Sequence, residues 1–385
     1  MYIRNRDELL SHGNRELRRA ALDIAEHALT RVDPYKAARD LVSLDGNTLR
    51  VGDLSYDLSQ RGRIYVLGAG KASLPIARAL EDILDERIHD SLVTVKEGQE
   101  SHTRIIRMRE ASHPLPDQRG LDASQEMMRL AEEARENDIV FCAITGGSSA
   151  LAPYPADGMS IDDKRLVHKL LLESGASIRE INAVRKHLSR IKGGRLALAI
   201  FPAEIINLTV SDVTGDPYDY ITCPTVPDTS TFEDALRVLD KYHLWERFPT
   251  AAANYLRNAS DAMENPKDFG ANRVHTFLLV KSSTVCEAAA EKARELGFAP
   301  YILTTEMEGD SNEEGSAFAQ QLSGHADPRP AALIAGGETT VTLESEGGEG
   351  GPNQEFALSA ARALSTDEQV VLSLDTDGTD GPTTL

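Results

Sequence analysis

Residues 63–73 read Arg-Ile-Tyr-Val-Leu-Gly-Ala-Gly-Lys-Ala-Ser, an apolar run that passes into a glycine-rich turn. The run at 63–68 is typical of a buried strand, and the next residues, 71–84, repeat apolar side chains at helical spacing. A strand that enters a helix through a short glycine turn is a building unit of parallel sheets. This stretch therefore predicts an α/β fold with a largely parallel sheet.

The same alternation extends along the chain on both sides of this stretch. A helical region is predicted at 14–42, strands at 91–95, 105–108, 138–145 and 204–210, and helices at 121–135, 162–173 and 178–192. A second series has strands at 274–280, 301–304, 331–335 and 370–374 and helices at 284–296, 312–322 and 354–364. Because 385 residues exceed one ordinary core, we predict two α/β domains, 1–257 and 258–385.

Composition excludes several classes of partner. The formal net charge is −20, which repels the phosphates of nucleic acids and of anionic membranes. No apolar run approaches the roughly 20 residues of a membrane helix, and the first residues lack the basic region of a signal peptide. The three cysteines have no metal-type spacing, which fits a reducing compartment. We expect a cytoplasmic protein that acts on small molecules.

Two glycine turns follow predicted strands and are candidate anion sites. Lys71 lies where a helix should begin, so its charge adds to the positive helix end. The turn at 145–150, Thr-Gly-Gly-Ser-Ser-Ala, can form a nest of N–H and O–H donors. Each can equally be a plain strand–helix turn. The candidate phosphate- or substrate-binding residues are Gly68, Gly70, Lys71, Ser73, Gly146, Gly147, Ser148 and Ser149.

The basic side chains of this acidic protein concentrate at 182–195. On a helix, Asn182 and Lys186 share a face, and the pair Gly193–Gly194 should end that helix. Asn182, Arg185 and Lys186 are therefore candidate ligands for an anionic substrate, although a solvated basic face explains them equally well.

Acidic turns follow other predicted strands. Asp212 and Asp216 come after the strand at 204–210, and one or two carboxylates suffice to hold Mg²⁺ when phosphate oxygens complete its shell. Turn capping by aspartate is the alternative. In the second domain, the turns at 336–340, 350–355 and 375–381 should converge on one pocket.

No covalent nucleophile is indicated. The chain has neither a Gly-x-Ser-x-Gly elbow nor a Cys–His pair in a nucleophile context. We interpret His113, in Ser-His-Pro-Leu-Pro-Asp, as a turn residue rather than a catalytic one.

In these motifs the chain resembles the glycerate 2-kinases. The resemblance spans about 14–385 and rests on eight motifs in the same order. They begin at residues 68 (Gly-Ala-Gly-Lys-Ala-Ser), 112 (Ser-His-Pro-Leu-Pro-Asp), 145 (Thr-Gly-Gly-Ser-Ser-Ala), 182 (Asn-Ala-Val-Arg-Lys-His-Leu-Ser), 211 (Ser-Asp-Val-Thr-Gly-Asp), 336 (Gly-Gly-Glu-Thr-Thr), 351 (Gly-Pro-Asn-Gln-Glu) and 375 (Asp-Thr-Asp-Gly-Thr-Asp-Gly). It implies a Rossmann-like N-terminal domain and a MOFRL-type C-terminal domain, with ATP, Mg²⁺ and glycerate in the cleft between them. We expect the second domain to continue beyond Leu385.

The resemblance also implies roles for individual residues. Lys71 and Asp212 are expected to be catalytic, with Asp212 acting as base or metal ligand. The expected nucleotide-binding residues are Gly337, Glu338, Thr339, Asn353, Gln354 and Asp377, and the expected metal ligands are Asp212, Asp216 and Asp375. Two departures bear on this assignment: the turn around Cys223 is shorter than in relatives, and Pro352 stands where many relatives have arginine.

We therefore predict an ATP-dependent kinase that converts D-glycerate into 2-phosphoglycerate, with a homodimer as a candidate assembly. An NAD(P)H-dependent hydroxypyruvate reductase is one alternative, although Ser73 occupies the position of the third glycine of a dinucleotide fingerprint. A non-catalytic sugar-phosphate-binding protein is the other.

Overall fold

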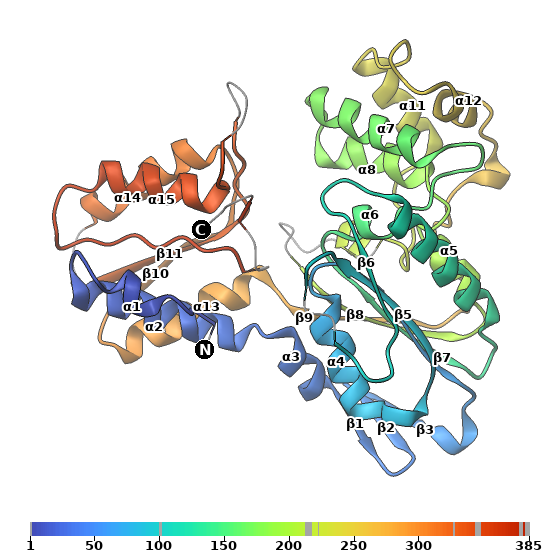
Figure 1. The fold of residues 1–385 in the computed structure, drawn as a ribbon, viewed down its shortest axis with the longest axis horizontal. Coiled ribbons are helices and arrows are strands. Elements are labelled where there is room, and N and C mark those ends of the chain that lie inside the picture. The colour runs from blue at the N-terminus through green and yellow to red at the C-terminus, as the bar shows by residue number, and fades with distance from the viewer. Residues whose placement is uncertain are drawn as a thin grey trace. The chain divides into compact units, whose positions relative to one another are not determined.

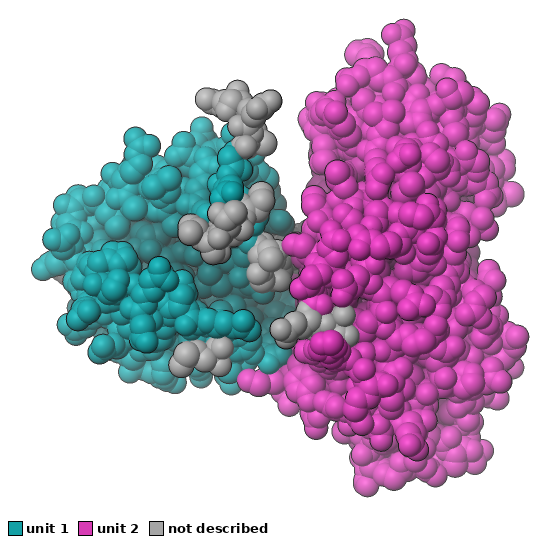
Figure 2. Space-filling model, in the orientation of Figure 1, with its two compact units in different colours: residues 1–33, 212–216, 280–385 teal, residues 34–211, 217–279 magenta. Residues whose placement is uncertain are grey.

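The computed structural model describes residues 2–99, 102–211, 218–221, 223–325, 328–342, 348–376 and 380–381. The chain forms two compact units (Figure 2). The middle of the chain, Pro34–Ser211 and Pro217–Leu279, forms the larger one. The two ends, Met1–Asp33 and Val280–Leu385, form the other. We call them the central unit and the terminal unit.

A six-stranded sheet organises the central unit (Figure 1). Its strand order is β6 (Met108–Ala111), β5 (Ile88–Lys96), β4 (Ile64–Ala69), β7 (Ile139–Ile144), β8 (Glu204–Val210) and β9 (Val274–Val280). β4 pairs in parallel with both β5 and β7, and the β5–β6 and β7–β8 pairs are parallel too. The predicted α/β fold with a largely parallel sheet is confirmed. Residues 64–69, from the apolar run at 63–68 and the glycine turn, form β4 in the interior of the sheet.

Strand β4 is buried on both faces because its alternate side chains enter different cores. Ile64 and Val66 pack in one core with α4 (Ser73–Leu84), which also contacts α3 (Pro34–Leu41). Tyr65 and Leu67 pack in a second core with α5 (Gln118–Glu133) and α9 (Arg195–Ile200). The apolar run that predicted the strand is thus divided between two layers of helices.

The segment before β4 differs from the prediction. The helical region at 14–42 is two helices, α2 (Arg15–Arg31) and α3, because Pro34 opens a new helix. A small antiparallel sheet then follows, made of β1 (Val42–Asp45), β2 (Thr48–Val51) and β3 (Leu54–Asp57). Its strands have four residues each, too short for a clear alternation pattern in the sequence.

A helical group stands above the carboxyl edge of the large sheet in Figure 1. It contains α7 (Ile161–Glu173), α8 (Ile178–His187), α11 (Phe232–Lys241) and α12 (Thr250–Arg257), which share one apolar core. Three of them begin with a capping box, at Ser160, Ser177 and Thr231. These boxes fix where α7 and α8 start, and so which of their side chains face inward. The short helix α10 (Tyr218–Ile221) precedes α11 and α12 in the chain.

The terminal unit is a smaller α/β layer structure. Two parallel strands, β10 (Ala299–Met307) and β11 (Ala331–Gly337), lie between α13 (Ser282–Glu295) with α2 on one side and α14 (Ser311–Gly324) with α15 (Pro352–Ala363) on the other (Figure 1). Helix α1 (Arg6–Leu9) precedes α2. The predicted strand at 370–374 is wrong, since no strand is assigned there. Within the described ranges, no helix is long and apolar enough to cross a bilayer.

The compact units divide the chain differently from the predicted boundary at residue 257. Strand β9 belongs to the large sheet, where Asn207 on β8 donates a hydrogen bond to Thr276. Helix α2 instead packs against α13, where Ala28 joins Ala288 and Ala289 in one core. Both differences come from packing between segments that are distant in the sequence.

The turn at Gly70 lies close to the turn at Thr145, and this contact can be tested. Gly70 has φ +144°, and a Cβ atom there would overlap the side-chain oxygen of Thr145. Gly98 also has a positive φ, +78°, but nothing lies within 4 Å of a Cβ atom there. We expect Gly70→Ala to lower the free energy of unfolding by roughly 3 kcal/mol and Gly98→Ala by about 1 kcal/mol, measured by urea unfolding. Equal losses would show that the contact with Thr145 is unimportant.

Candidate active site

The two predicted glycine turns meet at the carboxyl edge of the sheet, because β4 and β7 are neighbouring parallel strands. The backbone N–H of Lys71 donates to the carbonyl of Gly146 at 2.9 Å, and the N–H of Ala72 donates to Thr145 Oγ1 at 3.2 Å. Ser73 Oγ donates to the carbonyl of Ala143 at 2.7 Å. The turns therefore support each other.

This arrangement changes the interpretation of the first turn. Its first helical amides were expected to hold phosphate or carboxylate, but those of Lys71 and Ala72 bond to the second turn and that of Ser73 bonds to Gly70. Ser73 is fully buried and joins strand to helix. Among the candidates of this turn, Lys71 is the one whose side chain carries a charge.

A small pocket opens beside the second turn. Its volume is about 170 Å³, and it lies between the short helix α6 (Ser148–Leu151), the loop around His113, and the helices α7 and α8. It is lined by His113, Pro114, Pro116, Gly147, Ser149, Ala150, Met159, Lys164, Val167, His168, Arg185 and Leu188. Drug-sized ligands need about 300 Å³ or more, so this pocket suits a molecule of only a few heavy atoms.

Three cationic side chains gather at this pocket. Lys164 and Arg185 line it, and Lys192 lies behind Ser149, to whose hydroxyl its Nζ donates at 3.0 Å. Lys164 and Lys192 are 9% and 3% exposed. Within the described residues, none of the three pairs with a carboxylate. Burying charges without a counter-ion is costly, so an anion bound at this position would be stabilised by the cluster.

The pKa values reflect this uncompensated charge. Burial, together with the positive charges of Lys192 and Arg185, lowers the pKa of Lys164 to about 7. Burial also lowers the pKa of Lys192. An anion in the pocket would reverse these shifts because it favours the protonated lysines.

Lys71 lies next to this pocket. Gly147 has φ +84°, and a Cβ atom there would be 3.2 Å from both Lys71 Cγ and His113 Nε2. Glycine at this position therefore lets the lysine stem and the histidine ring approach the pocket wall together. His113 was interpreted as a turn residue, and the structure places its ring in the pocket lining.

The basic segment at 182–195 divides among three environments. Helix α8 ends at His187, five residues before the predicted end, so Lys192 belongs to a loop that turns back to Ser149. Arg190 pairs with Asp157 at an exposed position. Of the candidates here, Arg185 lines the pocket, whereas Asn182 is half-buried on α8 outside the lining.

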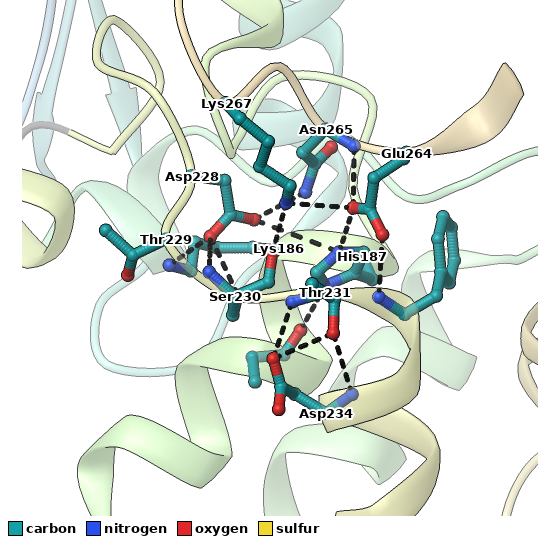
Figure 3. A network of polar contacts seen from close by, with 12 residues as sticks. Lys186, His187, Asp228, Thr229, Ser230, Thr231, Asp234, Glu264, Asn265 and Lys267 are labelled. Atoms are coloured by element: carbon teal, nitrogen blue, oxygen red, sulfur yellow. Dashed lines mark hydrogen bonds and ion pairs between the residues drawn. The ribbon is translucent and has the colours of Figure 1, made fainter. Parts of the chain in front are cut away.

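Lys186 enters a buried polar network rather than the pocket (Figure 3). Its Nζ lies 2.6 Å from Asp228 and 2.8 Å from Asp219. Burial opposes ionisation of Asp228, but the Lys186 charge and hydrogen bonds from Ser230 hold its pKa below the usual value. A substrate that contacts Lys186, as predicted, would therefore compete with Asp219 and Asp228 for its ammonium group.

The network continues to the loop at 264–266. His187 Nε2 lies 2.8 Å from Glu264, and Asn265 donates to Asp228 at 2.7 Å (Figure 3). Gly193 was expected to end a helix, but it has φ +63° and makes room for Asn265, because a Cβ atom there would overlap the Asn265 amide.

The predicted nucleotide site belongs to the terminal unit. The N–H of Glu338 donates to the carbonyl of Met307 at 2.9 Å, and Thr339 accepts from Ser311 at 2.9 Å. At the start of α15, the N–H groups of Asn353 and Gln354 donate to the carboxylate of Asp380, both at 2.8 Å. Gly337, with φ +147°, lies against the backbone of Met307. These residues hold the turns together in the structure.

Two of the three predicted metal ligands, Asp212 and Asp216, lie outside the described residues, as does Asp377, which was predicted to bind nucleotide. Asp375 is partly buried in the terminal unit. In the described part of the chain, no three His, Cys, Asp or Glu side chains are grouped as a metal site.

Sequence reasoning missed Lys164 and His168. They are four residues apart on α7, on the face that also buries Val167 and Leu171. A lysine and a histidine on the apolar face of an amphipathic helix were the available signal. Reading them as part of the site would have required knowing that α7 and α8 pack beside the second glycine turn.

Comparison with known proteins places these features in a wider group. Residues 20–257 match the family described as a domain of unknown function, DUF4147, and residues 331–385 match the MOFRL family. The chain is 41% identical over 375 residues to "Glycerate 2-kinase" of Pyrococcus horikoshii, covering 96% of this chain and 84% of that protein. It is 37% identical over 375 residues to "D-glycerate 2-kinase" of Thermotoga maritima, covering 95% and 84%. A crystal structure of glycerate kinase from Thermotoga maritima superposes with a TM-score of 0.77 at 34% identity, covering 96% and 86%.

The buried ion pair makes a prediction for stability. Lys186→Met leaves Asp219 and Asp228 without their cation, so we expect the free energy of unfolding to fall by about 3–5 kcal/mol. Arg190→Met, in the same segment, removes an exposed pair and should cost less than about 1 kcal/mol. Urea unfolding at neutral pH measures both. Similar losses in the two variants would contradict a structural role for the Lys186 pair.

Proposed function

Because the chain belongs to the glycerate 2-kinase family, we propose that it transfers the γ-phosphoryl group of ATP to D-glycerate and forms 2-phosphoglycerate. The family match covers both units of the chain. A phosphotransferase needs a site that binds a small anionic acceptor and holds one of its hydroxyl groups toward the nucleotide.

The observation that carries the proposal is the cationic pocket. Lys164, Arg185 and Lys192 place three positive charges around a cavity of about 170 Å³. A cavity of roughly 150 Å³ accommodates benzene, so a three-carbon acid is of suitable size. In a protein of net charge −20, a local concentration of cations without carboxylate partners among the described residues favours an anionic ligand.

We assign the carboxylate of glycerate to this cluster. The planar guanidinium of Arg185 can bind both carboxylate oxygens, and Lys164 adds a point charge from the facing helix. Lys192 holds the hydroxyl of Ser149 in place, so Ser149 can donate to the ligand from the pocket wall. In this proposal Gly146 and Ser148 do not contact the ligand and instead maintain the backbone conformation of the turn that presents Ser149.

The hydroxyl at C2 is adjacent to a carboxylate held in this way and is therefore the proposed acceptor. Its oxygen forms a bond to the γ-phosphorus, the bond to the bridging oxygen of ADP breaks, and the hydroxyl proton passes to a carboxylate, for which Asp212 or Asp216 is proposed. Lys71, beside Gly147, would stabilise the negative charge of the moving phosphoryl group.

The nucleotide is assigned to the turns of the terminal unit around Gly337, Thr339 and the start of α15, with Asp377. For the amides of Asn353 and Gln354 to bind a phosphate, the carboxylate of Asp380 would have to release them. Mg²⁺ would neutralise charge on the phosphates of ATP, held by one or two of Asp212, Asp216 and Asp375. A cytoplasmic location and a homodimer remain predictions.

The reductase alternative is less supported. A dinucleotide pyrophosphate needs free amides at the first strand–helix turn. The amides of Lys71 and Ala72 are instead bonded to the second turn. A non-catalytic binding protein would share the cationic pocket, and turnover distinguishes it from a kinase.

Product identity tests the proposal. The protein is incubated with D-glycerate, ATP and Mg²⁺, and enolase free of phosphoglycerate mutase is then added. Because enolase accepts 2-phosphoglycerate but not 3-phosphoglycerate, we expect phosphoenolpyruvate absorbance at once. A product that reacts only after mutase is added would place the phosphate on O3. Absence of any ADP would contradict the kinase itself.

The pKa of Lys164 makes a prediction for pH dependence. Below about pH 7 the side chain is charged and attracts the carboxylate, and above it the charge is lost before substrate binds. The KM for D-glycerate should therefore rise between pH 7 and 9, by up to about tenfold per unit. Lys164→Arg keeps its charge, so its KM should stay nearly constant. Effects of pH on ATP and Mg²⁺ are common to both proteins, and identical profiles would contradict the role of Lys164.

A further inference from the structure

His168 is an unused polar group on the wall of the cationic pocket. It lies one helical turn after Lys164 on α7, and its ring lines the cavity. Its Nδ1 atom is buried without a hydrogen-bond partner. In the described part of the chain no hydrogen bond or ion pair involves the other nitrogen, Nε2, and the side chain is half-buried in the pocket lining.

The ring differs in charge from its neighbours. Burial and the positive charges of Arg185, Lys164 and Lys192 lower the pKa of His168 to about 4, so it is neutral near pH 7. A neutral imidazole has one N–H and one bare nitrogen. Because a buried N–H without an acceptor costs more than a bare nitrogen, the proton belongs on Nε2. The pocket wall therefore offers one neutral donor beside two cations.

We propose that His168 binds the hydroxyl group of the substrate that is not phosphorylated, and so selects a dihydroxy acid over a monohydroxy acid. The inference rests on the proposed function. Lys164 and Arg185 attract the charged carboxylate, which leaves the neutral donor for an uncharged oxygen. If the hydroxyl next to the carboxylate receives the phosphoryl group, the terminal hydroxyl is the one left for His168.

The selectivity follows from the cost of an unmade hydrogen bond. When the ligand has a methyl group in place of the terminal hydroxyl, the ligand offers Nε2 no acceptor. A hydrogen bond between neutral groups accounts for about a tenfold difference in affinity. Removing the imidazole should remove this difference and leave carboxylate binding in place.

The test compares D-glycerate with D-lactate, which has the same carboxylate and adjacent hydroxyl but no terminal hydroxyl. In the wild-type protein and in His168→Phe and His168→Asn, the KM for D-glycerate and the inhibition constant of D-lactate are measured at pH 7. Phenylalanine keeps a planar ring without hydrogen-bonding atoms, and asparagine keeps a donor. Circular dichroism and thermal unfolding of both variants verify folding.

We expect His168→Phe to raise the KM for D-glycerate about tenfold while the inhibition constant of D-lactate changes less than about twofold. His168→Asn should recover part of the difference. Equal changes for both ligands would show a merely structural role, and no change for either would show that the ring does not contact substrate. Both results overturn the inference while turnover by the wild-type protein persists. Lack of turnover by the wild-type protein would overturn the proposed function as well.

Discussion

The buried contact between Lys186 and Asp228 fixes the orientation of helix α8, and the candidate site depends on that orientation. Successive side chains on a helix point about 100° apart, so holding one of them sets the directions of its neighbours. Lys186 is held by carboxylates from the loop that follows β8, and His187 is held by Glu264. With these two anchored, Arg185 is directed toward the pocket. A polar network outside the pocket lining thus positions a residue proposed to bind substrate.

Neighbouring cations on α8 differ in their partners: Lys186 pairs with carboxylates, whereas Arg185 lines the pocket. This difference suggests how an acidic protein can bind an acid. The net charge of −20 repels anions at long range, but solvent and salt screen that repulsion beyond about 10 Å. Lys164 and Arg185 line the pocket, so a ligand bound there would meet their charges at a range much shorter than the screening length. Lys186, equally basic and one residue away, contributes nothing to this attraction because its charge is already matched.

The sequence predicted much of the fold and indicated some of the residues that line the pocket. Apolar runs and glycine turns predicted a strand for each of the six strands of the large sheet, because strand burial leaves a local pattern. Five of them were placed in the first predicted domain, and the sixth, β9, was placed in the second. The placement of β9 and α2 was not predictable, since each is decided by contacts with distant segments. Of the candidates that the motifs indicated, Ser149 and Arg185 line the pocket. Lys164 lines it too but was not a candidate, because its place there depends on how two helices pack.

The depressed pKa of Lys164 has a consequence for the lifetime of the protein. In an unfolded chain this lysine binds its proton up to about pH 10, but in the folded protein it begins to lose it near pH 7. Between these values the unfolded chain binds more protons, so the empty protein gains stability as pH rises and is penalised at neutral pH. A bound acid stabilises the folded protein by roughly 2.7 kcal/mol at a hundredfold excess over Kd, a value that already includes the relief of this penalty. Since cellular proteases act on transiently unfolded chains, the amount of this protein should follow the concentration of its own substrate.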